Sequence, residues 1–116
     1  MLYTKDATIT TTDLTNILTV PSGYIAHWSL LFVSNHGGST NTATVYWDKA
    51  SGTDLYIIDG RNISSKDFIQ FSDSIIVMQP GDSIKAQIGS DGNFGIACTV
   101  DLLPAPAVFN AFNGGA

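Results

Sequence analysis

The strongest constraint on the fold is an alternation of apolar and polar residues with a period of two, which recurs from one end of the chain to the other. It is clearest near the C-terminus, where Ile84, Ala86 and Ile88 alternate with polar residues. Successive side chains of a β-strand point to opposite faces, so this pattern gives each segment one apolar face. No segment of the sequence shows an amphipathic helical pattern instead. The sequence therefore predicts an all-β domain.

Turn signals divide this pattern into strands. Pro21-Ser22-Gly23 and Pro80-Gly81-Asp82 combine a proline that presets φ with a glycine that accepts positive φ. All ten acidic residues are Asp, and Thr, Ser, Asn and Gly fill the polar positions, which disfavours helix. We expect a two-layer antiparallel β-sandwich, jelly-roll-like, with eight or nine strands. The expected strands are Ala7–Thr11, Thr15–Val20, Tyr24–Ser34, Thr42–Asp48, Asp54–Ile58, Phe68–Phe71, Ser74–Met78, Ser83–Ile88 and Phe94–Leu102.

Two of these strands carry a further expectation. The segment Gly89–Asn93 holds an Asp-Gly step suited to positive φ, so the last two strands should form a hairpin. The long strand Tyr24–Ser34 is apolar on both faces. Strict alternation places Trp28, Leu30 and Phe32 on one face and Ile25, Leu31 and Val33 on the other. A second apolar face needs a cover, which a local loop, a chain end or another subunit could supply.

The charge content favours assembly over life as a free monomer. Charged residues make up 13% of the chain, whereas about 25% is usual, and mean hydropathy is +0.17. The net charge of −5 and the absence of any run among the five basic residues exclude a nucleic-acid partner. Lys5 and Asp6 interrupt the N-terminus, and the apolar segment Tyr24–Val33 is too short to span a bilayer, so we expect no signal peptide and no membrane partner.

The potentially reactive residues do not form a catalytic or metal-binding pattern. His27 and His36 lack a second ligand at a metal-binding spacing. Cys98 shares the parity of Ile96 and Val100, which predicts a buried, reduced thiol and a reducing site of synthesis. The sequence therefore predicts no enzyme activity, no cofactor and no metal.

The C-terminal segment differs from the rest of the chain. We expect residues 1–103 to form the sandwich and residues 104–116 an extended apolar arm, because this segment has no charge, no strand periodicity and two prolines. Its apolar anchors, Val108, Phe109 and Phe112, are costly to leave in water. They could pack on their own domain or on a neighbouring subunit, and we favour the neighbour as the partner.

Two tyrosines are candidates for an exposed aromatic contact. Tyr46 and Tyr56 have the opposite parity to Trp47 and Leu55, which share the parity of the core. An exposed tyrosine combines a large apolar ring with a polar hydroxyl, a combination common at protein interfaces and in sugar-binding sites.

Several motifs together resemble small virion proteins of tailed bacteriophages. The resemblance covers about Thr15 to Leu103 and consists of turns and alternation: Thr19-Val20-Pro21-Ser22-Gly23-Tyr24, the strand ending Val33-Ser34-Asn35, Ala43-Thr44-Val45-Tyr46-Trp47, Leu55-Tyr56-Ile57-Ile58-Asp59-Gly60, and Val77-Met78-Gln79-Pro80-Gly81-Asp82-Ser83-Ile84. It implies a β-sandwich in a capsid decoration, fibre or tail-associated subunit.

What the resemblance implies is a structural role in the virion without catalysis, after synthesis in the host cytoplasm. A capsid decoration or cement subunit is the first expectation, with the major capsid protein or another virion protein as partner. A tail or fibre attachment subunit is the second, and a carbohydrate-binding module that recognises host-surface glycans is the third. We also expect self-association into a closed ring, with a trimer favoured.

Overall fold

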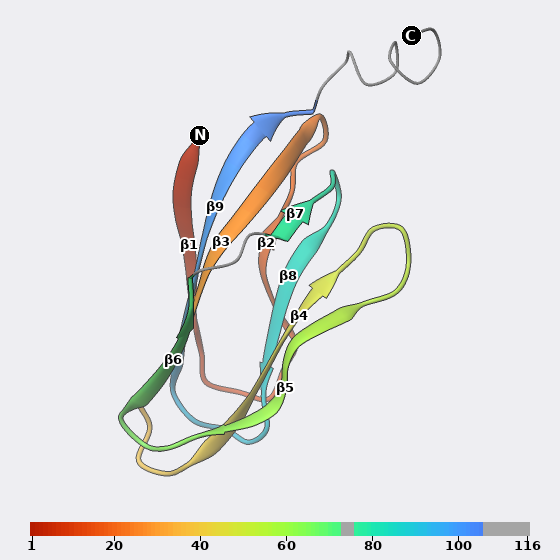
Figure 1. Ribbon diagram of the computed structural model, residues 1–116. Helices are drawn as coiled ribbons and strands as arrows, with labels where there is room; N and C mark the ends of the chain where they lie inside the picture. Colours follow the sequence, from red (N-terminus) through yellow and green to blue (C-terminus); the bar gives the residue numbers. More distant parts are fainter. Residues whose placement is uncertain (73–75, 106–116) are drawn as a thin grey trace, which may run out of the picture.

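The computed structural model describes residues 1–72 and 76–105, and this part of the chain contains nine β-strands and no helix (Figure 1). The strands are β1 (Leu2–Ile9), β2 (Thr15–Thr19), β3 (Tyr24–Asn35), β4 (Asn41–Asp48), β5 (Leu55–Ile63), β6 (Asp67–Phe71), β7 (Ile76–Met78), β8 (Ser83–Ile88) and β9 (Phe94–Pro104). The predicted all-β class and strand number are confirmed. The strands β1, β5 and β9 extend beyond their predicted bounds, and β1 begins at Leu2 although its first half lacks a clear alternation.

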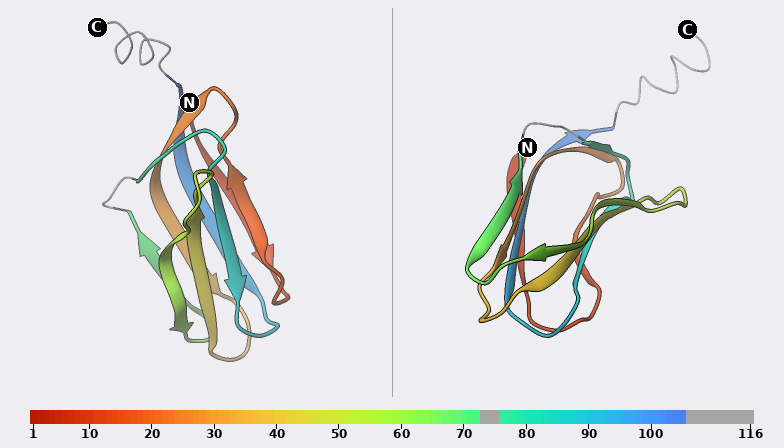
Figure 2. Two further views of the ribbon diagram at one scale, coloured as in Figure 1. Left: turned by 90° about the vertical axis from the view of Figure 1, so that its right-hand side faces the viewer. Right: turned by 60° about the horizontal axis from the view of Figure 1, so that its bottom comes forward.

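The strands form two antiparallel sheets that lie face to face as two layers (Figure 2). The first sheet has the order β1-β9-β3-β6, with β7 also paired to β3, and the second has the order β2-β8-β4-β5. β6 pairs with one half of β3 and β7 with the other, so together they act as one interrupted edge strand. The result is a jelly roll, in which most successive strands cross from one sheet to the other, while β4 and β5 pair within the second sheet and β6 and β7 both belong to the first.

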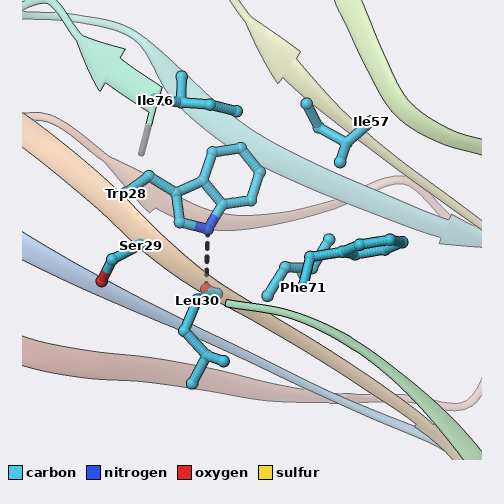
Figure 3. A pocket seen from close by; sticks show the side chains of 7 residues that line it. Trp28, Ser29, Leu30, Ile57, Phe71 and Ile76 are labelled. Carbon is cyan, nitrogen blue, oxygen red and sulfur yellow. Dashed lines mark hydrogen bonds between the residues drawn. The ribbon is translucent and has the colours of Figure 1, made fainter. Parts of the chain in front are cut away.

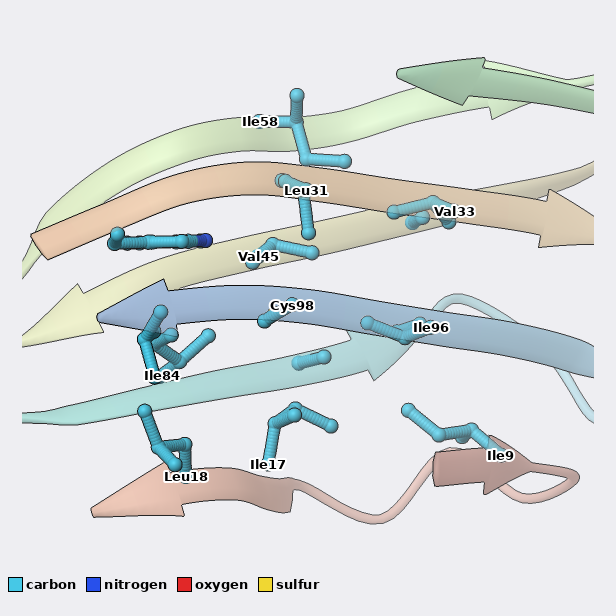
Figure 4. Close-up of a cluster of buried hydrophobic side chains, with 14 of the residues drawn as sticks. Ile9, Ile17, Leu18, Leu31, Val33, Val45, Ile58, Ile84, Ile96 and Cys98 are labelled. Atoms are coloured by element: carbon cyan, nitrogen blue, oxygen red, sulfur yellow. The ribbon is translucent and has the colours of Figure 1, made fainter. Parts of the chain in front are cut away.

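The core lies between the two sheets and contains the residues that share the inward parity of each strand. Leu31, Val33 and Ile96 of the first sheet face Val45 and Ile84 of the second (Figure 4). Each of these side chains is buried, and burial of each contributes about 1.5–3 kcal/mol. The core therefore joins the two layers along their whole length.

A β-bulge corrects the predicted parity of the long strand. The pairing of β3 with β9 shifts register between Trp28 and Leu30, so one extra residue is inserted at Ser29. Trp28, Leu31 and Val33 therefore all point into the core, and Leu30 points outward. Strict alternation had placed Trp28 on the same face as Leu30, which is wrong because the bulge reverses the parity halfway along the strand.

The predicted hairpin at the C-terminal end is also wrong. β8 belongs to the second sheet and β9 to the first, so segment 89–93 crosses between layers. The side chain of Asn41 holds this crossing, because its Nδ2 donates to the Ser90 carbonyl at 2.7 Å and its Oδ1 accepts from the Ser90 amide at 3.1 Å. The Gly92 amide donates to the Thr10 carbonyl of the β1–β2 connection at 3.0 Å. These contacts replace the pairing that an Asp-Gly step favours.

The two predicted proline turns are confirmed, and one of them contains a buried carboxylate. Gly23 and Gly81 have φ values of 83° and 88°, as these turns require. Asp82 is 3% exposed, and its carboxylate accepts hydrogen bonds from the Trp47 indole and from the backbone amides of Ala50 and Gln79, each at 2.9 Å. Asp82 thus joins the β7–β8 turn to β4 and to the β4–β5 loop.

Both ends of the described chain lie at one end of the sandwich (Figure 1). Met1 donates from its ammonium group to the Leu102 carbonyl and lies 3.0 Å from the Asp101 carboxylate. β9 continues past the expected domain boundary at Leu103, because Pro104 pairs with Tyr24 and the Ala105 amide donates to the Gly23 carbonyl at 2.7 Å. The predicted arm anchors Val108, Phe109 and Phe112 lie outside the described residues.

Candidate interaction surfaces

The outer face of the first sheet is unusually apolar. The strand registers place the following side chains outward, and we call them together the apolar face: Leu2, Ile25, Leu30, Phe32, Phe68, Val77, Ala97 and Leu103. Leu2, Phe68 and Val77 are 68%, 55% and 44% exposed. These residues come from all five strands of the sheet, with polar outward residues such as Thr4, His27, Gln70, Thr99 and Asp101 between them. Leu30, Phe32, Phe68 and Ala97 are neighbours near the middle of the sheet, and Ile25 and Leu103 are paired near the chain ends. Exposed apolar patches of this kind are typical of a protein contact.

A hollow lies within the apolar face over the small residues of β9. Gly95 and Ala97 form its floor, between the β1 residues Asp6 and Thr8 on one side and Phe32 of β3 on the other, and it encloses about 260 Å³. Phe32 in turn stacks on Phe68 with ring centroids 5.2 Å apart. The hollow therefore has an aromatic wall and a backbone floor, a shape suited to one apolar side chain from a partner.

Few charges interrupt the apolar face. None of the five Lys and Arg residues of the chain occupies an outward position on β1, β9, β3, β6 or β7. Asp6 and Asp101 are the outward carboxylates of β1 and β9, and the N-terminal ammonium group offsets Asp101 at 3.0 Å. Asp6 lines the edge of this face, and Lys66 and Asp67 lie beside Phe32 and Phe68, so the charges that a partner would meet are at its border.

A second opening lies at the interruption between β6 and β7. Trp28 lies among Ile57, Phe71 and Ile76, and its indole nitrogen donates to the Leu30 carbonyl at 2.9 Å (Figure 3). The opening encloses about 220 Å³ and has an apolar lining. The indole hydrogen bond satisfies a carbonyl at the β-bulge, where neither edge strand pairs with β3.

The outer face of the second sheet is polar. The outward residues, which we call the polar face, are Asn16, Thr42, Thr44, Tyr46, Asp48, Tyr56, Asn62, Lys85 and Gln87. Tyr46 and Tyr56 are direct partners across β4 and β5, and their rings stack with centroids 5.2 Å apart. Tyr56 is 53% exposed, and Tyr46 is half-buried beneath its neighbours. Both predicted tyrosines thus lie on one exposed surface; what they contact stays a prediction.

Charges beside the tyrosine pair interact with one another. Lys85 Nζ lies 2.6 Å from Asp48 Oδ2, and this hydrogen bond lowers the pKa of Asp48 and raises the pKa of Lys85. A hydrogen bond between the two carboxyl groups raises the pKa of Asp54. Partial burial raises the pKa of Tyr46, so its hydroxyl stays neutral at physiological pH. The polar face is therefore balanced within itself.

The reactive residues singled out from the sequence do not come together. Cys98 is buried as predicted, and burial raises the pKa of its thiol to about 12. His27 lies half-buried on the outer side of β3, and His36 is exposed beyond the end of that strand. Among residues 1–72 and 76–105 there is no group of three or more His, Cys, Asp or Glu side chains that could hold a metal ion. This part of the chain also contains no helix that could cross a membrane.

The sequence indicated the tyrosine pair but only part of the apolar face. It singled out the second apolar side of the long strand, yet it missed Phe68, Val77 and the hollow over β9. Their outward positions depend on which strands are neighbours, which alternation within one strand does not reveal. The run Gly95-Ile96-Ala97 is a sequence signal for the hollow. In this run small residues occupy the outward positions of β9, whereas large residues occupy its inward positions.

Comparisons with known proteins identify a similar fold rather than a family. No family model matches the chain, and no curated protein matches it. Among solved structures, a chain of the acidic stable capsid structure of Helicobacter pylori bacteriophage KHP30 is similar, with a TM-score of 0.57, 17% sequence identity, and coverage of 90% of this chain and 89% of that one. The crystal structure of PirA is more distant, with a TM-score of 0.48, 14% identity, and coverage of 87% and 94%. At such identities the similarity establishes the fold alone.

Proposed function

We propose that this chain is a non-enzymatic structural protein of a bacteriophage virion, and more narrowly a decoration or cement subunit that stabilises the capsid through protein–protein contacts. The observation that carries the proposal is the apolar face, whose large exposed side chains occur on several strands of one sheet in a domain with only 13% charged residues. A domain with this surface is better suited to a permanent assembly than to a free existence.

The structural comparison supports the same proposal. The similar KHP30 capsid chain is matched over nearly all of both chains, so the two are close in length and fold. A short chain that forms a single sandwich is suited to binding across the junctions between larger capsid subunits. The jelly roll hosts many functions, including viral capsid and lectin domains, so the fold adds weight only together with the surface.

Purified virions of the phage that encodes this chain provide the test. We expect the chain among the virion proteins by mass spectrometry, density for it on the outer capsid surface by cryo-electron microscopy, and heads that rupture at a lower temperature when its gene is deleted. Absence from purified virions would refute the virion role. A position on the tail or fibre would refute decoration and support an attachment subunit instead.

The tyrosine pair favours a second candidate function, binding of host-surface glycans. Tyr56 is exposed and stacks on Tyr46, which has Asp54, Asp48 and Lys85 nearby, and sugars combine a stackable apolar side with hydroxyl groups that such side chains bind. A glycan array tests this candidate. Retention by the wild-type protein and its loss in Tyr56→Ser would support it, and equal signals from the two proteins would exclude Tyr56 as the site.

A further inference from the structure

The apolar face lacks a cover within the described residues, and the chain itself contains a segment whose chemistry matches it. Residues 106–116 are uncharged and contain Val108, Phe109 and Phe112. The apolar face carries no Lys or Arg and has a hollow suited to one apolar side chain. Burying one of these anchors in the hollow would therefore remove apolar surface from water, with the Asp6 carboxylate at the β1 side of the hollow as the charged group beside it.

The length of the chain decides whether the anchors can reach the hollow of their own subunit. Ala105 continues in the direction of β9, because its amide donates to the Gly23 carbonyl one position beyond the Tyr24–Pro104 pair. Ala97, at the near side of the hollow, lies eight residues back along β9, about 27 Å away at the rise of a strand. Phe112 lies seven residues beyond Ala105 and reaches at most about 25 Å when fully extended.

A return of the chain over its own face takes at least two residues for the turn, which brings Phe112 back only to about the level of Asp101. Asp101 lies four residues, about 13 Å, from Ala97, which is farther than a phenylalanine side chain reaches, so none of the three anchors can occupy the hollow of its own subunit. A neighbouring subunit imposes no such limit, since its hollow can lie anywhere along the path of the segment. We infer that the C-terminal segment of one copy binds the apolar face of a second copy, with Phe109 or Phe112 in the hollow between Phe32 and the β1 strand. This contact is heterologous, and we expect it to close into a ring, with a trimer favoured.

The inference concerns contacts between copies of this chain and does not require the virion role. Its test uses three full-length variants. The arm variant is Val108→Ser/Phe109→Ser/Phe112→Ser. The face variant is Ala97→Lys, which places a charge on the floor of the hollow. The control is Asn62→Lys, which adds the same charge to the polar face, where Asn62 is exposed. Phe32→Thr is a second face variant in case Ala97→Lys does not fold, as judged by circular dichroism.

Light scattering at up to about 100 µM measures association. We expect the wild type and Asn62→Lys to be oligomeric, and the arm and face variants, each alone, to be monomeric, with dissociation constants raised about 100-fold or more. A mixture of the arm variant with the face variant should form a one-to-one complex, because one supplies the intact face and the other the intact arm. This complementation is not expected of any contact within a single subunit.

Three results would overturn the inference: a monomeric wild type, a face variant that associates like the wild type, or a mixture that does not associate. A monomeric wild type whose melting temperature falls in the arm variant would show instead that the segment packs on its own subunit. In each case the position of the chain in virions can still be established separately, so the virion proposal and this inference can fail independently.

Discussion

Each outer face of the sandwich carries one stacked pair of aromatic rings, and the two pairs have almost the same geometry. Phe32 and Phe68 lie 5.2 Å apart with an interplanar angle of 29°, and Tyr46 and Tyr56 lie 5.2 Å apart at 28°. The surroundings differ. The phenylalanines adjoin a hollow floored by Gly95 and Ala97, whereas the tyrosines adjoin charged and hydroxyl side chains.

The difference shows that the outer face of one sheet is suited to contact with water and the outer face of the other is not. On the polar face, Lys85 and Asp48 offset one another, and the stacked rings of Tyr46 and Tyr56 carry polar hydroxyl groups. On the apolar face, large side chains such as Leu2, Phe68 and Val77 remain exposed with no polar group of their own. Two sheets that share one core thus present opposite chemistry to their surroundings.

The largest expected effect tests which residues belong to the core and which to the apolar face. Leu31→Ala should lower the free energy of unfolding by about 3 kcal/mol, because Leu31 is 3% exposed and its loss leaves a cavity between the sheets. Its neighbour Leu30 points outward after the β-bulge, so Leu30→Ala should cost less than about 1 kcal/mol. Urea denaturation of both variants measures the difference. Equal losses, or a larger loss for Leu30→Ala, would contradict the bulge.

The sequence predicted the class and the inner layer of this fold well. Alternation in Ser83–Ile88 and Phe94–Leu102 identified the buried residues of β8 and β9, including Cys98, and the proline turns were located correctly. These features depend on local physics, namely strand parity and backbone preferences at Pro and Gly. They can be read from a few consecutive residues.

The features that sequence reasoning missed depend on neighbours in space. The bulge at Ser29 inserts a residue where β6 gives way to β7, and nothing in Trp28-Ser29-Leu30 marks it. The crossing at residues 89–93 is held by Asn41, which lies about fifty residues earlier. Strand parity was enough to place Tyr46 and Tyr56 on an outer face. The extent of the apolar face could not be predicted in this way, because it depends on the order of the strands in the sheet.

The second prediction concerns the support of the polar face. Asp82→Ala leaves the Trp47 indole and the amides of Ala50 and Gln79 without their acceptor in a buried site, so it should lower the free energy of unfolding by about 2–3 kcal/mol. Asp91→Ala, at an exposed loop position, is the matched control and should change it by less than about 0.5 kcal/mol. Similar melting temperatures for the two variants would show that the Asp82 contacts contribute little.

The third prediction compares the two aromatic pairs directly. Phe68→Ser and Tyr56→Ser each remove the more exposed ring of a pair and should each lower the free energy of unfolding by about 1 kcal/mol. Only Phe68→Ser changes the apolar face, so only this variant should weaken self-association by light scattering. If Tyr56→Ser weakens association equally, the two faces do not differ as their chemistry indicates.

The smallest expected effect is the pH dependence of the ion pair on the polar face. The pKa of Asp48 is lowered below its ordinary value of 3.8, mainly by the hydrogen bond from Lys85, so the folded state favours the carboxylate. This stabilisation is present above pH 3.8 and is lost as the pH falls through the lower pKa of the folded state. Asp54 has the opposite effect. Its pKa is raised in the folded state, so its contribution to the stability of the fold is lost as the pH rises through this raised pKa.

Lys85→Met removes the hydrogen bond that favours the Asp48 carboxylate. We therefore expect the wild type to melt at a higher temperature than Lys85→Met at pH 7, and the gap to narrow as the pH falls from 3.8 to about 2. The effect should be small and should shrink in high salt, because both side chains are about 30% exposed and solvent screens the pair. Lys5→Met, at the edge of the first sheet, makes the same change in net charge away from Asp48 and Asp54, so its melting temperature should follow the wild type in parallel across this range. Methionine retains an apolar stem of similar length, so a gap between wild type and Lys85→Met that stays constant from pH 7 to pH 2 would mean that Lys85 does not stabilise the fold through the Asp48 carboxylate.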